Sequence, residues 1–284
     1  MAYVIISFTY SKFSVKKDVV YIFQLFDRQG VTCIKMGRTV LGRALRATCC
    51  FLVDGLAVEG GSPYFKTKLN TFYQENKPHQ AVFTHGHEDH AGNVDLFNKL
   101  GITPYVHQSA INYLSSPPVI PYYRRFVWGA PAAGQSQAIG DIIETAKHTF
   151  HVVDTPGHSE DHLCLYDEKE GWLFTGDLYV GERIFYLYKN ENLPKIKETL
   201  KKLSALDFST LFCSHRGPLQ KGPEALTRKL LHLEALEEEA KALQLKGHSI
   251  PHITKKLLGK EDYMCFISKG EFSKTALVTA LLST

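Results

Sequence analysis

The stretch Thr84–Asn93, with the sequence THGHEDHAGN, decides how the rest of this chain is interpreted. Five of its side chains are imidazoles or carboxylates: His85, His87, Glu88, Asp89 and His90. Residues 80–83 before it are short and apolar like a buried strand, and residues 91–100 after it carry apolar side chains at helical spacing. The stretch is therefore predicted to be a strand-to-helix turn. Its mixture of imidazole and carboxylate suits a borderline cation such as zinc.

Three further ligand-type residues follow apolar strands later in the chain. They are His158 in DTPGHS, Asp177 in FTGD and His215 in SHRGP, and each lies beside a glycine-containing turn. This recurrence predicts that loops from several strands converge at one edge of a sheet. Together with His85, His87, Asp89 and His90 they exceed the four ligands of a tetrahedral zinc, so two ions with a shared ligand are expected.

The composition is that of an ordinary globular protein. The 284 residues are 44% hydrophobic, and 33 basic and 29 acidic side chains leave a net charge of +4, too balanced to indicate nucleic-acid binding. The six cysteines are scattered without a CxxC pair, which predicts reduced core residues in a cytoplasmic protein. Met1–Tyr10 is predicted to be a strand and not a signal peptide, and no apolar run is long enough to span a membrane.

Hydrophobic patterns divide the chain into two parts. Residues 1–60 are predicted to be β-rich, with a hairpin turning at Asp54-Gly55, and residues 80–115 alternate between strand and helix. Strands predicted at 149–153, 163–166, 172–174 and 211–213 each lead to a turn. Three helices follow at 223–245, 249–258 and 273–282. We therefore predict a catalytic domain at 1–220 and a helical C-terminal extension at 221–284, with a winged-helix-like character.

The segment Ser116–Gly140 shows no clear period, yet it is rich in aromatic residues. A loop of this length within a compact domain is typical of a lid, although aromatic packing or an oligomer contact is an alternative. Its candidate substrate contacts are Tyr122, Tyr123, Arg124 and Trp128. Tyr179, two residues after Asp177, is a fifth candidate.

The combined motifs resemble those of the metallo-β-lactamase-fold hydrolases, including hydroxyacylglutathione hydrolases and lactamase-beta-like proteins. The family motif HxHxDH appears here as residues 85–90, and the resemblance covers roughly residues 30–220. It implies an αββα sandwich of two mixed sheets, with the site at their common edge. It also implies that His85, His87 and His158 hold one metal, that Asp89, His90 and His215 hold the second, and that Asp177 bridges them.

One departure from the family pattern concerns a carboxylate that supports a metal ligand. The family usually has Asp-x-Gly after an early strand, whereas this chain has Glu59-Gly60-Gly61. That carboxylate normally supports a ligand and does not itself bind metal, so metal affinity or positioning is the property in question.

The family likeness implies a hydrolase with two divalent ions, zinc being favoured over iron or manganese. A bound metal lowers the pKa of water to roughly 7, and hydroxide held between the two ions would attack the ester, thioester or lactone of a small molecule. Asp89 is the candidate proton shuttle for the leaving group. The aromatic segment also suits a homodimer contact.

Two other functions stay open. Lactamase-beta-like endoribonucleases share the core and a helical extension, and Arg124-Arg125 with the lysines of residues 195–202 could contact phosphates. A metal-binding scaffold without turnover is the non-enzymatic alternative. A zinc β-lactamase is disfavoured, since those enzymes lack an aspartate in the position of Asp177 and are exported.

Overall fold

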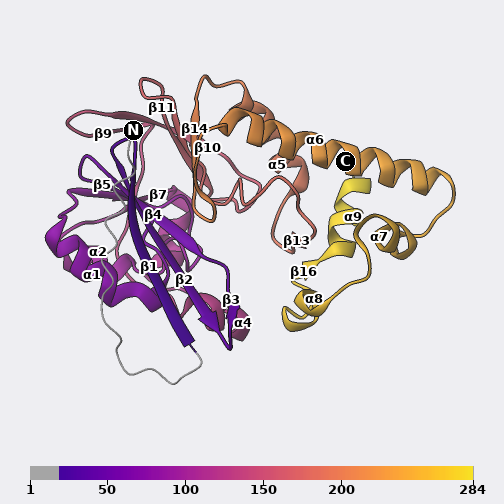
Figure 1. The fold of residues 1–284 in the computed structure, drawn as a ribbon, viewed down its shortest axis with the longest axis horizontal. Helices are drawn as coiled ribbons and strands as arrows, with labels where there is room; N and C mark the ends of the chain where they lie inside the picture. Colours follow the sequence, from indigo (N-terminus) through magenta and orange to yellow (C-terminus); the bar gives the residue numbers. More distant parts are fainter. Residues whose placement is uncertain (1–18, 284) are drawn as a thin grey trace.

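The chain folds into four layers, in which two mixed β-sheets pack face to face and helices cover both outer sides (Figure 1). The computed structural model describes residues 19–283, so the strand predicted within Met1–Tyr10 lies outside the described part. The predicted αββα sandwich is confirmed. No helix among residues 19–283 combines the length and apolarity needed to cross a bilayer.

The first sheet is antiparallel at its beginning and parallel at its end. Its order is β1-β2-β4-β5-β6-β7-β8, with β3 paired to β2. The strands are β1 (Val19–Arg28), β2 (Val31–Val40), β3 (Arg43–Ala44), β4 (Thr48–Val53), β5 (Leu56–Val58), β6 (Gln80–Val82), β7 (Tyr105–Val106) and β8 (Gln137–Ala138). The predicted hairpin joins β4 and β5, and Asp54 and Gly55 both take positive φ, 45° and 79°, as a two-residue turn requires.

The second sheet places three of the predicted site loops at neighbouring strand ends. Its order is β15-β14-β12-β11-β10-β9, and β12 and β14 are parallel neighbours. The strands are β9 (Ile142–Glu144), β10 (Thr149–Asp154), β11 (Leu163–Asp167), β12 (Trp172–Phe174), β14 (Thr210–Cys213) and β15 (Gly217–Leu219).

Period-two alternation sends strand side chains into two different cores. In β2, Cys33 faces the other sheet, whereas Ile34 and Met36 face the first helical layer. In β12, Trp172 and Phe174 lie between the sheets, and Leu173 faces the second helical layer. The first layer comprises α1 (Lys66–Glu75), α2 (Val94–Lys99) and α3 (Ile111–Ser115), and the second comprises α5 (Leu193–Ser204) and α6 (Gly222–Leu245).

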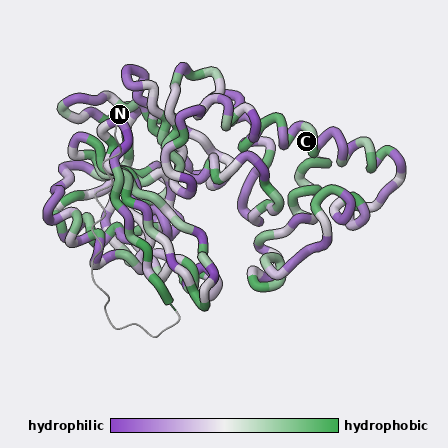
Figure 2. Tube along the Cα trace, in the orientation of Figure 1, coloured by the Kyte–Doolittle hydropathy of each residue, from purple (hydrophilic) through white to green (hydrophobic). Residues whose placement is uncertain are grey.

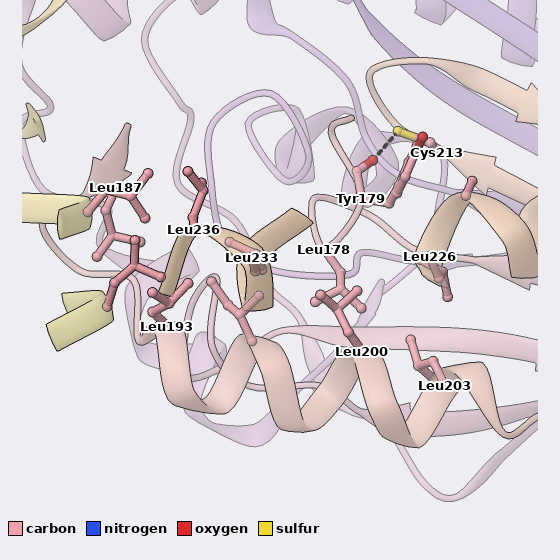
Figure 3. Close-up of a cluster of buried hydrophobic side chains, with 14 of the residues drawn as sticks. Leu178, Tyr179, Leu187, Leu193, Leu200, Leu203, Cys213, Leu226, Leu233 and Leu236 are labelled. Carbon is pink, nitrogen blue, oxygen red and sulfur yellow. Dashed lines mark hydrogen bonds between the residues drawn. The ribbon is translucent and has the colours of Figure 1, made fainter. Parts of the chain in front are cut away.

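The C-terminal extension shares its core with the second helical layer. The tube of α6 alternates between hydrophilic and hydrophobic along its length (Figure 2), and its buried Leu233 and Leu236 belong to the same cluster as Leu193 and Leu200 of α5 (Figure 3). The remaining elements are α7 (Ile250–Leu258), α8 (Tyr263–Ile267), β16 (Phe272–Ser273) and α9 (Lys274–Leu282); β16 pairs with β13 (Leu187–Tyr188). The division at residue 220 stays a prediction.

The segment 116–140 contains regular structure that the sequence did not indicate. A helix, α4 (Tyr122–Trp128), and the short strand β8 lie within it. No α4 residue is buried, so the helix has no apolar face for a periodic pattern to reveal. Contacts from elsewhere hold it instead: Arg38 Nη1 donates to the carbonyl of Phe126 at 2.6 Å, and Ser62 Oγ donates to that of Trp128 at 2.6 Å.

Candidate metal centre

The seven predicted ligands come together at one edge of the sandwich. His85, His87, Asp89 and His90 occupy the turn between β6 and α2, and His158, Asp177 and His215 follow β10, β12 and β14. Potential ligand atoms lie within 4.8 Å of one another in three groups: His85/His87/His158, His85/His90/Asp177 and Asp89/His90/His215. The first and third groups are the two sets that the family resemblance implied.

Asp177 lies between the two sets. Its Oδ1 is 3.3 Å from His90 Nε2 and 3.1 Å from His215 Nε2. Its Oδ2 is 3.6 Å from His158 Nε2, so one carboxylate reaches both sides of the cluster. Asp89 Oδ2 is 3.5 Å from both His90 Nε2 and His215 Nε2. This spacing is compatible with a shared carboxylate between two cations.

The charges of the cluster favour a cation. Burial alone would lower the pKa of His90, but the carboxylates of Asp177, Glu59 and Asp89 hold that pKa well above its usual range. Burial likewise opposes ionisation of Asp177, yet His215 and His90 keep its pKa well below normal. The carboxylates that favour a proton on His90 would equally favour a divalent ion there.

Two buried atoms provide a test of whether a metal fits. His90 Nε2 and Asp177 Oδ1 are both buried and lie 3.3 Å apart, but neither makes a hydrogen bond of acceptable geometry. Buried polar atoms in this condition are costly unless something else binds them. Burial, with the neighbouring imidazoles, lowers the pKa of His85 and His87 well below normal, so these rings stay in the neutral form that binds metals. The residues present therefore fit divalent metal ions.

The outward-facing nitrogens of three imidazoles are fixed by acceptors around the cluster. His158 Nδ1 lies 2.8 Å from Glu191 Oε1, His215 Nδ1 lies 2.7 Å from the carbonyl oxygen of Ala47, and His90 Nδ1 lies 3.0 Å from Glu59 Oε1. An acceptor at Nδ1 leaves Nε2 free to face the centre of the cluster and sets the ring orientation.

Glu59 is the hub of these supporting contacts. It is fully buried at a positive φ of 73°. Besides His90, its carboxylate accepts hydrogen bonds from Thr84 Oγ1 at 2.6 Å, from the Thr84 amide at 3.2 Å and from Ser214 Oγ at 3.1 Å. The glutamate thus reaches both the turn after β6 and the turn after β14, although the family pattern has a shorter aspartate.

His162 also contributes to this support. The sequence motifs gave it no role, but it lies four residues after His158 and is buried. Its Nε2 accepts the backbone N–H of Asp177 at 3.2 Å, and its Nδ1 is 2.7 Å from Thr155 Oγ1. The Asp177 amide can only donate, so the proton of His162 is on Nδ1. His162 therefore holds the turn that carries Asp177.

The predicted substrate contacts divide into different environments. The Trp128 ring stacks on that of His215, with centroids 5.6 Å apart, beside the cluster. Tyr122 is 81% exposed, and its ring stacks on that of Phe126. Tyr123 donates its hydroxyl to Glu271 Oε2 at 2.6 Å, which links α4 to the C-terminal extension.

Two of the candidate substrate contacts have other partners in the fold. The guanidinium of Arg124 forms a two-point pair with the buried Glu88. Tyr179 lies in the core beneath the second sheet, where its carbonyl accepts from Cys213 Sγ (Figure 3). Leu178 and Tyr179 both belong to that hydrophobic cluster.

Three of the four lysines of α5 pair with carboxylates. Lys195 pairs with Glu160 at 3.1 Å, Lys197 pairs with Glu237, and Lys201 pairs with Glu234 at 3.3 Å. Their charges are thus partly neutralised, whereas Lys202 Nζ donates to the carbonyl of Asp154 at 3.4 Å.

The sequence did not indicate the contacts of three residues at the site. Tyr188 ends the two-residue strand β13 and Glu191 lies in the loop between β13 and α5, where no periodicity or motif marks them. The ring of Tyr188 contacts that of His87 edge-on at 6.3 Å. Glu88 lies inside the ligand motif, but only the fold shows that its partner is Arg124, 36 residues away.

A sequence profile described as the metallo-beta-lactamase superfamily matches residues 47–215, the part of the chain that contains all seven clustered residues. The chain belongs to the metallo-beta-lactamase superfamily. Within the superfamily it is similar to the thioesterase pkgB of Emericella nidulans, with 27% identity over 64% of this chain and 48% of that protein. It is also similar to a hydroxyacylglutathione hydrolase of Legionella pneumophila, with 29% identity over 49% of this chain and 48% of that protein.

The chain spans about half the length of these two superfamily relatives. A solved structure of a metallo-beta-lactamase family protein from Thermus thermophilus covers 94% of this chain and 93% of its own, with a TM-score of 0.60 and 19% identity. At that identity the likeness concerns the fold alone.

Proposed function

We propose that this superfamily member is a metal-dependent hydrolase of small-molecule esters, thioesters or lactones. The observation that carries the proposal is the convergence of His85/His87/His158 and Asp89/His90/His215 around Asp177. The similar proteins named a thioesterase and a hydroxyacylglutathione hydrolase support hydrolysis of a thioester in particular.

His85, His87 and His158 would hold one divalent ion, and Asp89, His90 and His215 would hold a second. Asp177 would be shared between the two ions. Zinc, iron and manganese all accept nitrogen and oxygen ligands, and zinc is favoured by the predominance of imidazole. Bound divalent ions of this kind supply Lewis acidity and activate water at neutral pH.

The chain's own residues orient and enclose the reaction. Trp128 shields His215 on one side, and Tyr188 lies against His87 on the other. Both aromatic rings exclude water from the ligands and offer apolar surface to the substrate. Arg124 beside His87 and Asp89 is paired with Glu88, and three of the four α5 lysines are paired with carboxylates, which supports a neutral ester or thioester over RNA.

A substrate panel tests this function. Purified protein should hydrolyse thioesters, esters or lactones, and both a chelator and His87→Ala should abolish the turnover because they remove a metal or a ligand. RNA or phosphodiester cleavage without ester cleavage would select the endoribonuclease alternative. Failure to turn over any panel member, with metal bound, would favour the non-catalytic scaffold.

Asp89 is proposed to deliver the proton to the leaving group. Its side chain is 4% exposed and faces His90 and His215 through Oδ2, so it lies inside the cluster. Asp89→Asn keeps the shape but cannot carry the proton, and we expect turnover to fall about 10²- to 10⁴-fold, the usual contribution of a general acid. Metal content should be measured in parallel. Full turnover with both metals retained would place the proton transfer elsewhere.

A further inference from the structure

Glu88 is a buried carboxylate in the middle of the ligand turn. It is 0% exposed and lies between His87 and Asp89 in the sequence. Arg124 of α4 approaches it with two parallel contacts, Nε to Oε1 at 2.8 Å and Nη2 to Oε2 at 2.6 Å. This forked geometry is the strongest form of a carboxylate–guanidinium pair, and a lysine cannot reproduce it.

The rest of the Arg124 guanidinium is also occupied. Its Nη1 donates to the hydroxyl of Tyr188 at 3.1 Å, and the Arg124 side chain is only 13% exposed. Tyr188 in turn lies edge-on to the ring of His87. Arg124 therefore contacts the ligand turn twice, through Glu88 and through the aromatic ring that packs on His87.

The same helix reaches the C-terminal extension on its other side. Tyr123 donates to Glu271, and its ring contacts Phe272 of β16 at 6.3 Å. Phe272 also packs on Tyr188, with centroids 5.0 Å apart. Neighbouring residues of α4 thus join the extension to the turn that carries the ligands.

We infer that Arg124 is a positioning residue, which through Glu88 holds His87 and Asp89 in the geometry that metal binding requires. The expected effect of Arg124 on turnover rests on the proposed hydrolase function, whereas its expected effect on metal binding does not. Removal of the guanidinium would leave Glu88 buried without its counter-charge and without its two hydrogen-bond donors, which is unfavourable unless the turn rearranges. Such a rearrangement would move the residues on both sides of Glu88.

The test uses the full chain with Arg124→Gln, Arg124→Lys, Glu88→Gln and the double variant Glu88→Gln/Arg124→Gln. Zinc affinity is measured by competition with a chromophoric chelator, alongside thermal unfolding and steady-state kinetics on the best ester substrate. Each single variant should lose about 10- to 100-fold in zinc affinity, the usual effect of losing an outer support of a ligand. The double variant should lose less than the product of the two single effects, because it leaves no unpaired charge.

The exposed pair Arg228–Glu182 is the matched control. Its nitrogen–oxygen distance is also 2.8 Å, but its side chains are 50% and 42% exposed. Arg228→Gln and Glu182→Gln should leave zinc affinity unchanged, since exposed pairs contribute little. If Arg124→Gln fails to fold, Arg124→Lys and Glu88→Gln still measure how loss of the forked pair changes zinc affinity.

Several outcomes would overturn the inference. Arg124→Lys with unaltered zinc affinity would show that the forked pair is not required. Arg124→Gln that raises KM alone, with zinc affinity and kcat unchanged, would make Arg124 a substrate contact. If the unmodified chain binds zinc but hydrolyses nothing, the proposed function fails, whereas the zinc affinities still decide the role of Arg124.

Discussion

Glu59 stands where the family pattern has the shorter aspartate, and its carboxylate contacts residues on both sides of the site. Related motifs use aspartate, but this chain has a glutamate that contacts His90, Thr84 and Ser214 at once. Glu59 has a positive φ of 73°, and its longer side chain is completely buried. The negative charge of the Glu59 carboxylate also favours a cation at His90.

Replacement of Glu59 by Gln should therefore weaken metal binding more than it weakens the fold. The amide keeps the size of the side chain but loses the negative charge that orients His90, so zinc affinity should fall about 10- to 100-fold. Chelator competition measures this loss, and Glu59→Asp should retain more affinity than Glu59→Gln. Equal zinc affinity in Glu59→Gln and the unmodified chain would contradict a supporting role for the charge.

At the level of elements, the site depends on turns that strands present at one edge. The turn after β12 contains Gly176 at a φ of 46°, and a Cβ atom there would lie 2.4 Å from Thr84 Oγ1 and 2.8 Å from His162 Nε2. Thr84 belongs to the turn after β6, so these two turns pack too closely for any side chain at residue 176. The glycine of FTGD is thus a packing requirement as well as a conformational one.

Gly176→Ala should consequently destabilise the chain and displace Asp177. We expect a loss of about 1–3 kcal/mol in the free energy of unfolding, typical of overpacking, together with weaker zinc binding. Gly140→Ala is the control, because a Cβ at Gly140 would meet nothing within 4 Å. Denaturant unfolding of the two variants checks the difference, and equal stability would refute the close contact between the turns.

Across the whole molecule, one hydrophobic cluster joins the sandwich to the C-terminal extension. The cluster runs from Leu173 of β12 through Leu200 of α5 and Leu233 of α6 to Leu277 of α9. Burial of apolar surface is the main stabilising contribution to folding, so a continuous cluster couples its parts. The extension should unfold together with the sandwich.

Leu277→Ala in the extension should lower the stability of the entire chain. The side chain is 0% exposed, and its truncation should cost about 2–5 kcal/mol in the free energy of unfolding. Leu231→Ala, at a position 57% exposed, should change stability by less than about 0.5 kcal/mol. Calorimetry should show one shifted transition for Leu277→Ala. Two separate transitions, with only one of them shifted, would instead indicate an independent extension.

The sequence alone determined the strand-to-helix turn at Thr84–Asn93, the β4–β5 hairpin and the set of seven residues that the fold brings together, because hydrophobic period, turn chemistry and ligand spacing are local properties. The tertiary structure decided the rest. The helix α4 forms without an amphipathic pattern, Tyr179 is buried in the core, and Arg124 pairs with Glu88. These outcomes depend on partners tens of residues apart, and such contacts exist only after the two sheets have packed and excluded water from the space between them.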